Sequence, residues 1–169
     1  RSAIGRERRF LEQNSQEQLP SYRIRRSLAR DDEAVMATIL FTHEKCVDHD
    51  PGPMHPESPA RLRAVHAALA DDKYANLERR EAPIAEVEQI ARIHPVAYVE
   101  KVLEAIPSKG RVMLDGDTHV SPSSGEAARR AVGALCSAVD AVVDKETNNA
   151  FCAVRPPGHH AEQTIPMGF

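Results

Sequence analysis

The residues of this chain best suited to chemistry are two adjacent histidines, His159 and His160, in the segment RPPGHHA of residues 155–161. Imidazole has a free pKa near neutrality, which suits such a pair to passing protons at physiological pH. Neighbouring side chains of an extended segment point in opposite directions, so only an irregular turn lets both rings face one cavity. The two prolines, together with the conformational freedom of Gly158, predict such a turn. On local chemistry alone, an exposed polar loop explains the pair equally well.

A short strand is predicted directly before this turn. Residues 149–154 read NAFCAV, an apolar run without internal Gly or Pro, which is typical of a buried strand. Pro156 fixes its own φ and biases Arg155 towards extended geometry, so the strand has to end there. The histidine pair then lies just past the carboxyl end of a strand, where open α/β sheets place their ligands.

The segment RPPGHHA resembles the zinc-dependent histone deacetylase family, in its class II and bacterial histone deacetylase-like amidohydrolase branch. Gly168-Phe169 also fits this family, as does HPESPAR at residues 55–61. A further match is the loop from Asp117 to Ser121-Pro122, which leads into an alanine-rich helix. These matches occur in the family's order and cover roughly the N-terminal half of such a catalytic domain.

The resemblance implies a fold and a reaction. The fold is an arginase/deacetylase-like three-layer α/β fold with a mainly parallel sheet, present only as its N-terminal part. The reaction is zinc-dependent hydrolysis that removes acetyl or other acyl groups from lysine side chains or related amines. His160 is expected to take a proton from water and return it to the leaving amine, with His159 as its electrostatic partner. Gly168 and Phe169 are expected to line a narrow substrate tunnel, and Asp117 to hold the substrate backbone.

No zinc ligand is assigned to this chain, because the resemblance places the ligands of Zn²⁺ downstream of Phe169. A chain that contains the histidine pair but lacks the zinc ligands is expected to be inactive by itself. The expected partner is an acetylated protein or polyamine. Two alternatives stay open: a noncatalytic fragment or pseudoenzyme used for binding, and an acetylpolyamine amidohydrolase.

Other residues have the type and spacing of metal ligands, or the position of residues that line a cavity. His43, Cys46 and His49 are each separated by two residues and precede His55, but structural zinc sites usually draw ligand pairs from separate elements. Asp-x-His at residues 117–119 lies upstream of the histidine pair, whereas the family's metal motif follows it. Arg61 is interpreted either as lining an inner cavity or as an exposed helix residue.

The chain divides into an extension and a core. Residues 1–35 contain eight arginines, no lysine and six acidic residues, with little apolar periodicity. We interpret them as a basic extension outside the core: a linker, a translated upstream region, a fusion remnant, a transit peptide or a tail that contacts an acidic partner. Residues 36–169 are interpreted as the N-terminal part of the catalytic domain.

Strand and helix patterns alternate through the core, which predicts a layered α/β fold. A strand is expected at residues 36–41. Apolar spacing predicts helices at residues 59–70, 86–93 and 95–106, and a proline opens the first and the last of these. Ser123 and Glu126 have capping-box spacing before a last helix that reaches about Val143.

Composition narrows the class of protein. A formal net charge of −3 argues against nucleic acid as a direct partner. The sequence has neither a membrane-length apolar stretch nor a signal-peptide core, so we expect a cytoplasmic or nuclear protein that is not secreted. Cys46, Cys136 and Cys152 are interpreted as buried free thiols of a reducing compartment.

Overall fold

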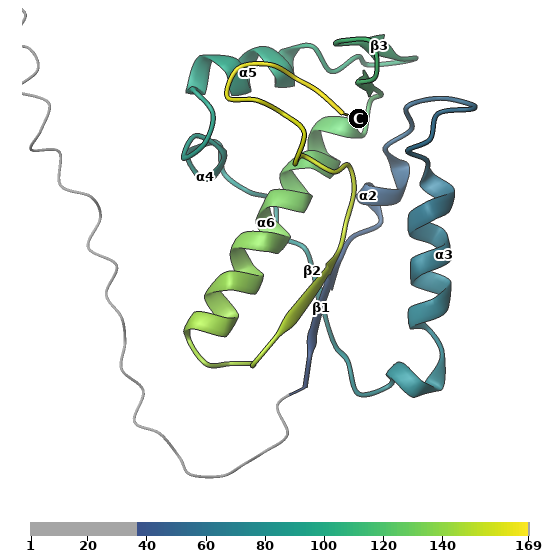
Figure 1. The fold of residues 1–169 in the computed structure, drawn as a ribbon, viewed down its shortest axis with the longest axis vertical. Helices are drawn as coiled ribbons and strands as arrows, with labels where there is room; N and C mark the ends of the chain where they lie inside the picture. The colour runs from purple at the N-terminus through teal and green to yellow at the C-terminus, as the bar shows by residue number, and fades with distance from the viewer. Residues whose placement is uncertain (1–36, 169) are drawn as a thin grey trace, which may run out of the picture. The chain divides into compact units, whose positions relative to one another are not determined.

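The computed structural model describes residues 37–168, and every structural statement below concerns these residues. Its main sheet has the strand order β2-β1-β5, with β1 at Ile39–Thr42, β2 at Glu78–Glu81 and β5 at Ala150–Ala153. Both neighbours of β1 run parallel to it, and Ile39 lies opposite Glu78 and Ala150. The expected α/β fold with a parallel sheet is confirmed (Figure 1). The predicted extension at residues 1–35 and the predicted site residue Phe169 lie outside the described residues.

Helices cover both faces of this sheet. Figure 1 shows α6 (Ser124–Val143) on one side of the strands and α3 (Pro59–Leu69) on the other. Successive residues of a strand face opposite sides, and β1 follows this rule. Ile39 and Phe41 pack with the alanines of α6, whereas Leu40 packs with Cys46 and with Leu62 of α3. The three layers expected from the sequence are therefore present.

Shorter elements connect these layers. They are α2 (Lys45–Asp48), the 3-10 helix η2 (Asp72–Tyr74), α4 (Val87–Ile90), α5 (Val96–Glu104), β3 (Val112–Met113) and β4 (His119–Val120). The helices expected at residues 59–70 and 95–106 are present, and the one expected at residues 86–93 is limited to α4. The antiparallel pair of β3 and β4, like α2, was not predicted, because elements of two to four residues are too short to show periodicity.

The start of α6 differs from the sequence-based expectation. Ser123 is its N-cap residue but makes no side-chain capping hydrogen bond, so the predicted capping box is wrong. Instead, the hydroxyl of Ser124 accepts a hydrogen bond from the backbone N–H of Ser121 at 2.7 Å. In the middle of α6, a Cβ at Gly133 would lie 2.0 Å from the carbonyl oxygen of Pro83. The residue at this position therefore has to be glycine for the helix to pack against that loop.

Apolar surface is left open on β5 and α6. The prediction of a buried strand at residues 149–154 is partly wrong, because Phe151 is 49% exposed while Ala153 is buried. The physical reason is that β5 is an edge strand of the described sheet. Leu135, Val139 and Val143 are also exposed on α6. Uncovered apolar faces of this kind agree with a domain of which only a part is described.

The three cysteines are free thiols that differ in burial. Cys46 is buried, as expected, whereas Cys136 on α6 and Cys152 on β5 are only half-buried, which corrects the prediction for these two. Burial raises the pKa of the Cys46 thiol, which keeps it protonated at neutral pH. Within the described part of the chain, no helix combines the length and the apolar character needed to cross a bilayer.

Candidate functional site

The histidine pair lines one cavity beyond the carboxyl end of β5. His159 and His160 are exposed, and their ring centroids lie 4.3 Å apart with the ring planes at 44°. Both belong to the lining of a cavity of about 470 Å³, together with Cys152 and Arg61. Arg61 is thus both an exposed helix residue and a cavity residue. The prediction that an irregular turn would bring both imidazoles to one cavity is confirmed.

The glycine required beside the histidine pair is Gly168, and not the Gly158 that the sequence suggested. Gly158 does not have a positive φ, and a Cβ there would meet no atom of the described chain within 4 Å. Gly168 has a φ of +74°, and a Cβ there would lie 2.3 Å from the Cβ of His160. The backbone of Gly168 therefore lies directly against His160, and no side chain fits between them.

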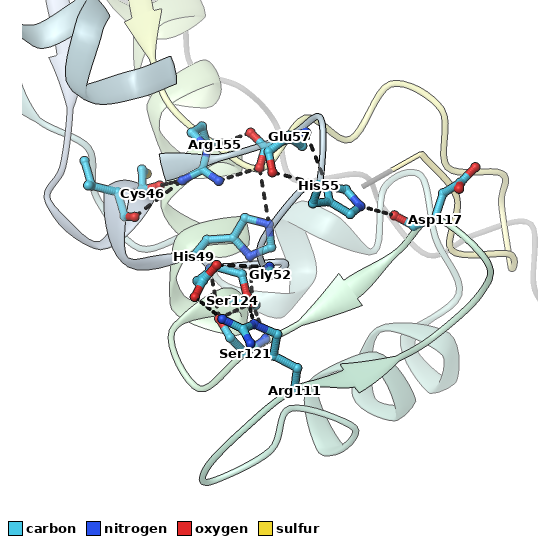
Figure 2. Close-up of polar contacts among 12 residues, drawn as sticks. Cys46, His49, Gly52, His55, Glu57, Arg111, Asp117, Ser121, Ser124 and Arg155 are labelled. Carbon is cyan, nitrogen blue, oxygen red and sulfur yellow. Dashed lines mark hydrogen bonds and ion pairs between the residues drawn. The ribbon is translucent and has the colours of Figure 1, made fainter. Parts of the chain in front are cut away.

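A buried ion pair underlies the turn. The Nε of Arg155 donates a hydrogen bond to Oε1 of Glu57 at 2.6 Å, and its Nη2 donates to Oε2 of the same carboxylate. The third nitrogen, Nη1, donates to the carbonyl of Cys46 at 2.8 Å and lies 3.4 Å from that of Val47. Arg155 is 4% exposed and Glu57 is 1% exposed. Figure 2 shows the guanidinium of Arg155 between Cys46 on one side and Glu57 on the other.

His49 adds a neutral imidazole to the same network. Its Nδ1 lies 2.7 Å from the hydroxyl of Ser124, and its Nε2 lies 3.7 Å from Oε2 of Glu57 (Figure 2). Burial, reinforced by the positive charge of Arg155, lowers the pKa of His49 to about 4. At neutral pH the ring therefore carries no charge, and Arg155 is the cation that balances Glu57. Nε2 is buried and makes no hydrogen bond to another described residue, so Ser124 is the hydrogen-bond partner of this ring.

The lowered pKa of His49 predicts a pH dependence of stability. Because the unfolded histidine has a pKa of 6.5 and the folded one about 4, the unfolded state binds more protons between these values. The free energy of unfolding is thus expected to fall by up to about 3 kcal/mol as the pH drops from 6.5 to 4. Urea unfolding of the full-length protein across this range should show a smaller slope for His49→Asn. His94→Asn, outside the network, should keep the wild-type slope, and an unchanged slope in His49→Asn would contradict the prediction.

The segment containing His55 also contacts the predicted substrate loop. Nε2 of His55 lies 3.0 Å from the carbonyl oxygen of Asp117, and its Nδ1 accepts a hydrogen bond from the backbone N–H of Glu57 at 3.2 Å. The carboxylate of Asp115 accepts the backbone N–H of Asp117 at 2.9 Å, which shapes the turn. The side chain of Asp117 is exposed and points away from His55 (Figure 2).

A second ion pair holds the loop between α2 and His55. Arg111 donates from Nη2 to the carboxylate of Asp50 and from Nε to its carbonyl oxygen at 3.1 Å. These bonds hold the pKa of Asp50 below its usual range. The other carboxylate oxygen accepts the N–H of Gly52, whose φ of +121° favours glycine. The sequence offered no sign of this pair, because its members lie 61 residues apart.

The described residues do not fit a zinc site. No group of three or more His, Cys, Asp or Glu side chains among residues 37–168 could hold a metal ion. The closely spaced residues at 43, 46 and 49 point to different partners: the N–H of Lys45 for His43, the carbonyl of Ala127 for Cys46 and Ser124 for His49. The ring of His119 packs edge-on against His55 at 5.4 Å, and its buried Nδ1 finds no hydrogen-bond partner in this part of the chain.

The sequence analysis missed the four residues of the buried network: Glu57, Arg155, His49 and Ser124. Arg155 carried one usable signal: a charged residue between an apolar strand and two prolines is placed where burial is expected, and a buried charge needs a partner. The identity of that partner was not available, because Glu57 lies 98 residues away.

Comparison with known proteins places these observations in a family. Residues 55–169 match the family described as histone deacetylase domain. A histone deacetylase-like amidohydrolase from Pseudomonas aeruginosa is 34% identical over 150 residues, covering 78% of this chain and 39% of the relative. A probable deacetylase from Archaeoglobus fulgidus is 35% identical over 137 residues, covering 79% of this chain and 38% of the relative. The chain thus spans about 40% of the length of these curated relatives.

A solved structure agrees with the sequence matches. The crystal structure of the HDA15 HD domain superimposes with a TM-score of 0.73 at 28% sequence identity. The match covers 80% of this chain and 40% of that chain. The arginase/deacetylase fold expected from the sequence is therefore confirmed, as the N-terminal part of a domain.

Proposed function

Since this chain belongs to the histone deacetylase family, we propose that residues 36–169 form the proton-transfer wall of an amidohydrolase active site. The observation that carries the proposal is the placement of His159 and His160 on one cavity at the carboxyl end of β5. The substrate class is an amide of acetate, or of another acyl group, with a lysine side chain or a related amine.

The proposed chemistry is general acid–base catalysis. His160 takes a proton from the water molecule whose oxygen forms a bond to the amide carbon. It then returns this proton to the nitrogen as the carbon–nitrogen bond breaks, so that a carboxylic acid and an amine are released. His159, with its ring centroid 4.3 Å from that of His160, is the electrostatic partner. Both can reach substrate because both are exposed to the cavity.

Three further residues complete the proposed wall. Gly168 lets the backbone lie against His160 without a side chain between them. Phe169 follows it directly, and we place it along the stem of the acylated amine. The exposed carboxylate of Asp117 accepts hydrogen bonds from the substrate backbone. The contact of the Asp117 carbonyl with His55 supports this role, because it fixes the loop that carries the carboxylate.

The family is generally zinc-dependent, and the described residues do not form a zinc site. We therefore propose that the zinc ligands lie beyond Phe169 and that the chain by itself is inactive. An acetylpolyamine is the second candidate substrate, because the same proton chemistry serves any acetylated amine. The expected partners are accordingly an acetylated protein or polyamine.

Hydrolysis of two substrates by the full-length protein tests the proposal. An acetyl-lysine peptide and an acetylated polyamine should be assayed side by side for acetate release, and zinc should be measured by elemental analysis. We expect turnover of at least one substrate and about one zinc per protein. The isolated residues 36–169 are the matched control, expected to show neither turnover nor stoichiometric zinc. A full-length protein that hydrolyses neither substrate would favour a binding role instead.

A further inference from the structure

Arg155 lies at the point where β5 ends and the turn to the histidine pair begins. Its guanidinium uses all three nitrogens, two on the carboxylate of Glu57 and one towards the carbonyls of Cys46 and Val47. Three residues, Pro156, Pro157 and Gly158, lie between Arg155 and His159, and they have no regular secondary structure. The position of the turn therefore depends on how its two ends are held.

We infer that Arg155 is a positioning residue for His159 and His160, and that Glu57 is the anchor through which it acts. This inference rests on the proposed function. Glu57, Arg155 and both histidines line the same cavity. The ion pair is therefore part of the cavity that contains the reacting groups. The other end of the turn is set by the backbone of Gly168 against His160.

The geometry of the Arg155–Glu57 pair suits it to holding the backbone of the turn in place. Arginine presents a planar fork that binds both oxygens of a carboxylate, and its remaining N–H groups reach carbonyls at a fixed angle. Lysine would keep the charge but lose this fork. His49, with its pKa lowered to about 4, stays neutral beside the pair. It therefore does not compete as a second cation with Arg155 for the carboxylate of Glu57.

The chain contains a matched ion pair that has no connection with the cavity. Arg130 on α6 donates from Nη2 to the carboxylate of Glu126 at 3.0 Å and from Nη1 to the carbonyl of Ala82 at 2.8 Å. It thus combines a carboxylate and a carbonyl contact, as Arg155 does, but neither Arg130 nor Glu126 lines the cavity. A purely structural role of Arg155 would leave kcat and the histidine resonances of a folded Arg155→Lys variant unchanged, as is expected for Arg130→Lys.

The experiment compares Arg155→Lys with Arg130→Lys in the full-length protein. Arg155→Lys is expected to lower kcat by about tenfold to a hundredfold, because small displacements of catalytic groups have effects of this size. KM for the substrate should change by less than about threefold, and the pH profile of kcat should shift. The imidazole resonances of His159 and His160, assigned by NMR, should move. Arg130→Lys should leave kcat, the pH profile and these resonances as in the wild type.

A second variant covers the case in which Arg155→Lys does not fold. Glu57→Asp keeps the charge and withdraws the carboxylate by one methylene, and it should produce the same changes in kcat and in the histidine resonances. Wild-type kcat and unmoved resonances in the folded variant would overturn the inference and leave the proposed function intact. If the wild-type protein hydrolyses none of the substrates, the proposed function fails, and the resonances still decide whether Arg155 positions the pair.

Discussion

His160→Ala in the full-length protein is expected to lower turnover of the acylated substrate by about 10²–10⁴-fold, the usual effect of removing a general acid–base. The physical reason is that no proton acceptor then remains at the position of the His160 ring. Binding of a substrate analogue should change little, because the rest of the cavity wall is intact. Phe169→Ala is expected to do the reverse in part, weakening substrate binding while leaving the proton chemistry in place.

The measurements are deacylation kinetics, analogue binding and metal content on the same preparations. Zinc content should be unchanged in His160→Ala, and its loss would instead identify His160 as a ligand. His94→Ala is the control histidine: it contacts the carbonyl of Gln163 and the ring of Tyr98, does not line the cavity, and should retain activity. Near-normal turnover in His160→Ala would end the catalytic assignment.

Glu57→Gln is expected to cost the full-length protein about 3–5 kcal/mol of free energy of unfolding. The substitution leaves the guanidinium of Arg155 buried without its counter-charge, since that side chain is 4% exposed. Bringing an unpaired cation into the protein interior is more costly than losing a single hydrogen bond. Urea denaturation at pH 7.5 is the appropriate measurement, because His49 is neutral there in both the folded and the unfolded state.

Glu126→Gln provides the matched control for this prediction. Its partner Arg130 is partly exposed on α6, so water can solvate the cation that remains. The loss in that variant should be within about 1 kcal/mol. Replacing Glu57 and Arg155 together, by Gln and Met, should cost less than Glu57→Gln alone, because no charge is left buried. Equal losses in the two single variants would show that burial of the Glu57–Arg155 pair has no energetic consequence.

The two predictions concern different parts of one arrangement. The proposed role of His160 is proton transfer to and from the substrate, whereas the role of Glu57 is to stabilise the folded protein. If Arg155 holds the turn as inferred, a variant at Glu57 should affect turnover as well as stability. A variant at His160 should affect turnover alone, because the ring of His160 is exposed and forms no part of the buried network.

The sequence by itself determined the local frame of the site. The apolar run at residues 149–154, the prolines after it and the adjacent histidines predicted a strand, a turn and a pair facing one cavity, and the structure contains all three. Local prediction succeeded here because the prolines and the continuous apolar run restrict the backbone through nearest neighbours alone. It failed at Ser123, where the capping-box spacing was present but the neighbouring Ser124 hydroxyl served His49 and Ser121 instead.

Only the tertiary structure decided which side chains are partners. Glu57 meets Arg155 across 98 residues, and His55 meets Asp117 across 62. Likewise, Gly168 rather than Gly158 needs to be glycine, since the requirement comes from the approach of His160 and not from the turn residues themselves. Pairing, burial and the lowered pKa of His49 all arise when segments distant in sequence exclude water from one another, and no local pattern records that exclusion.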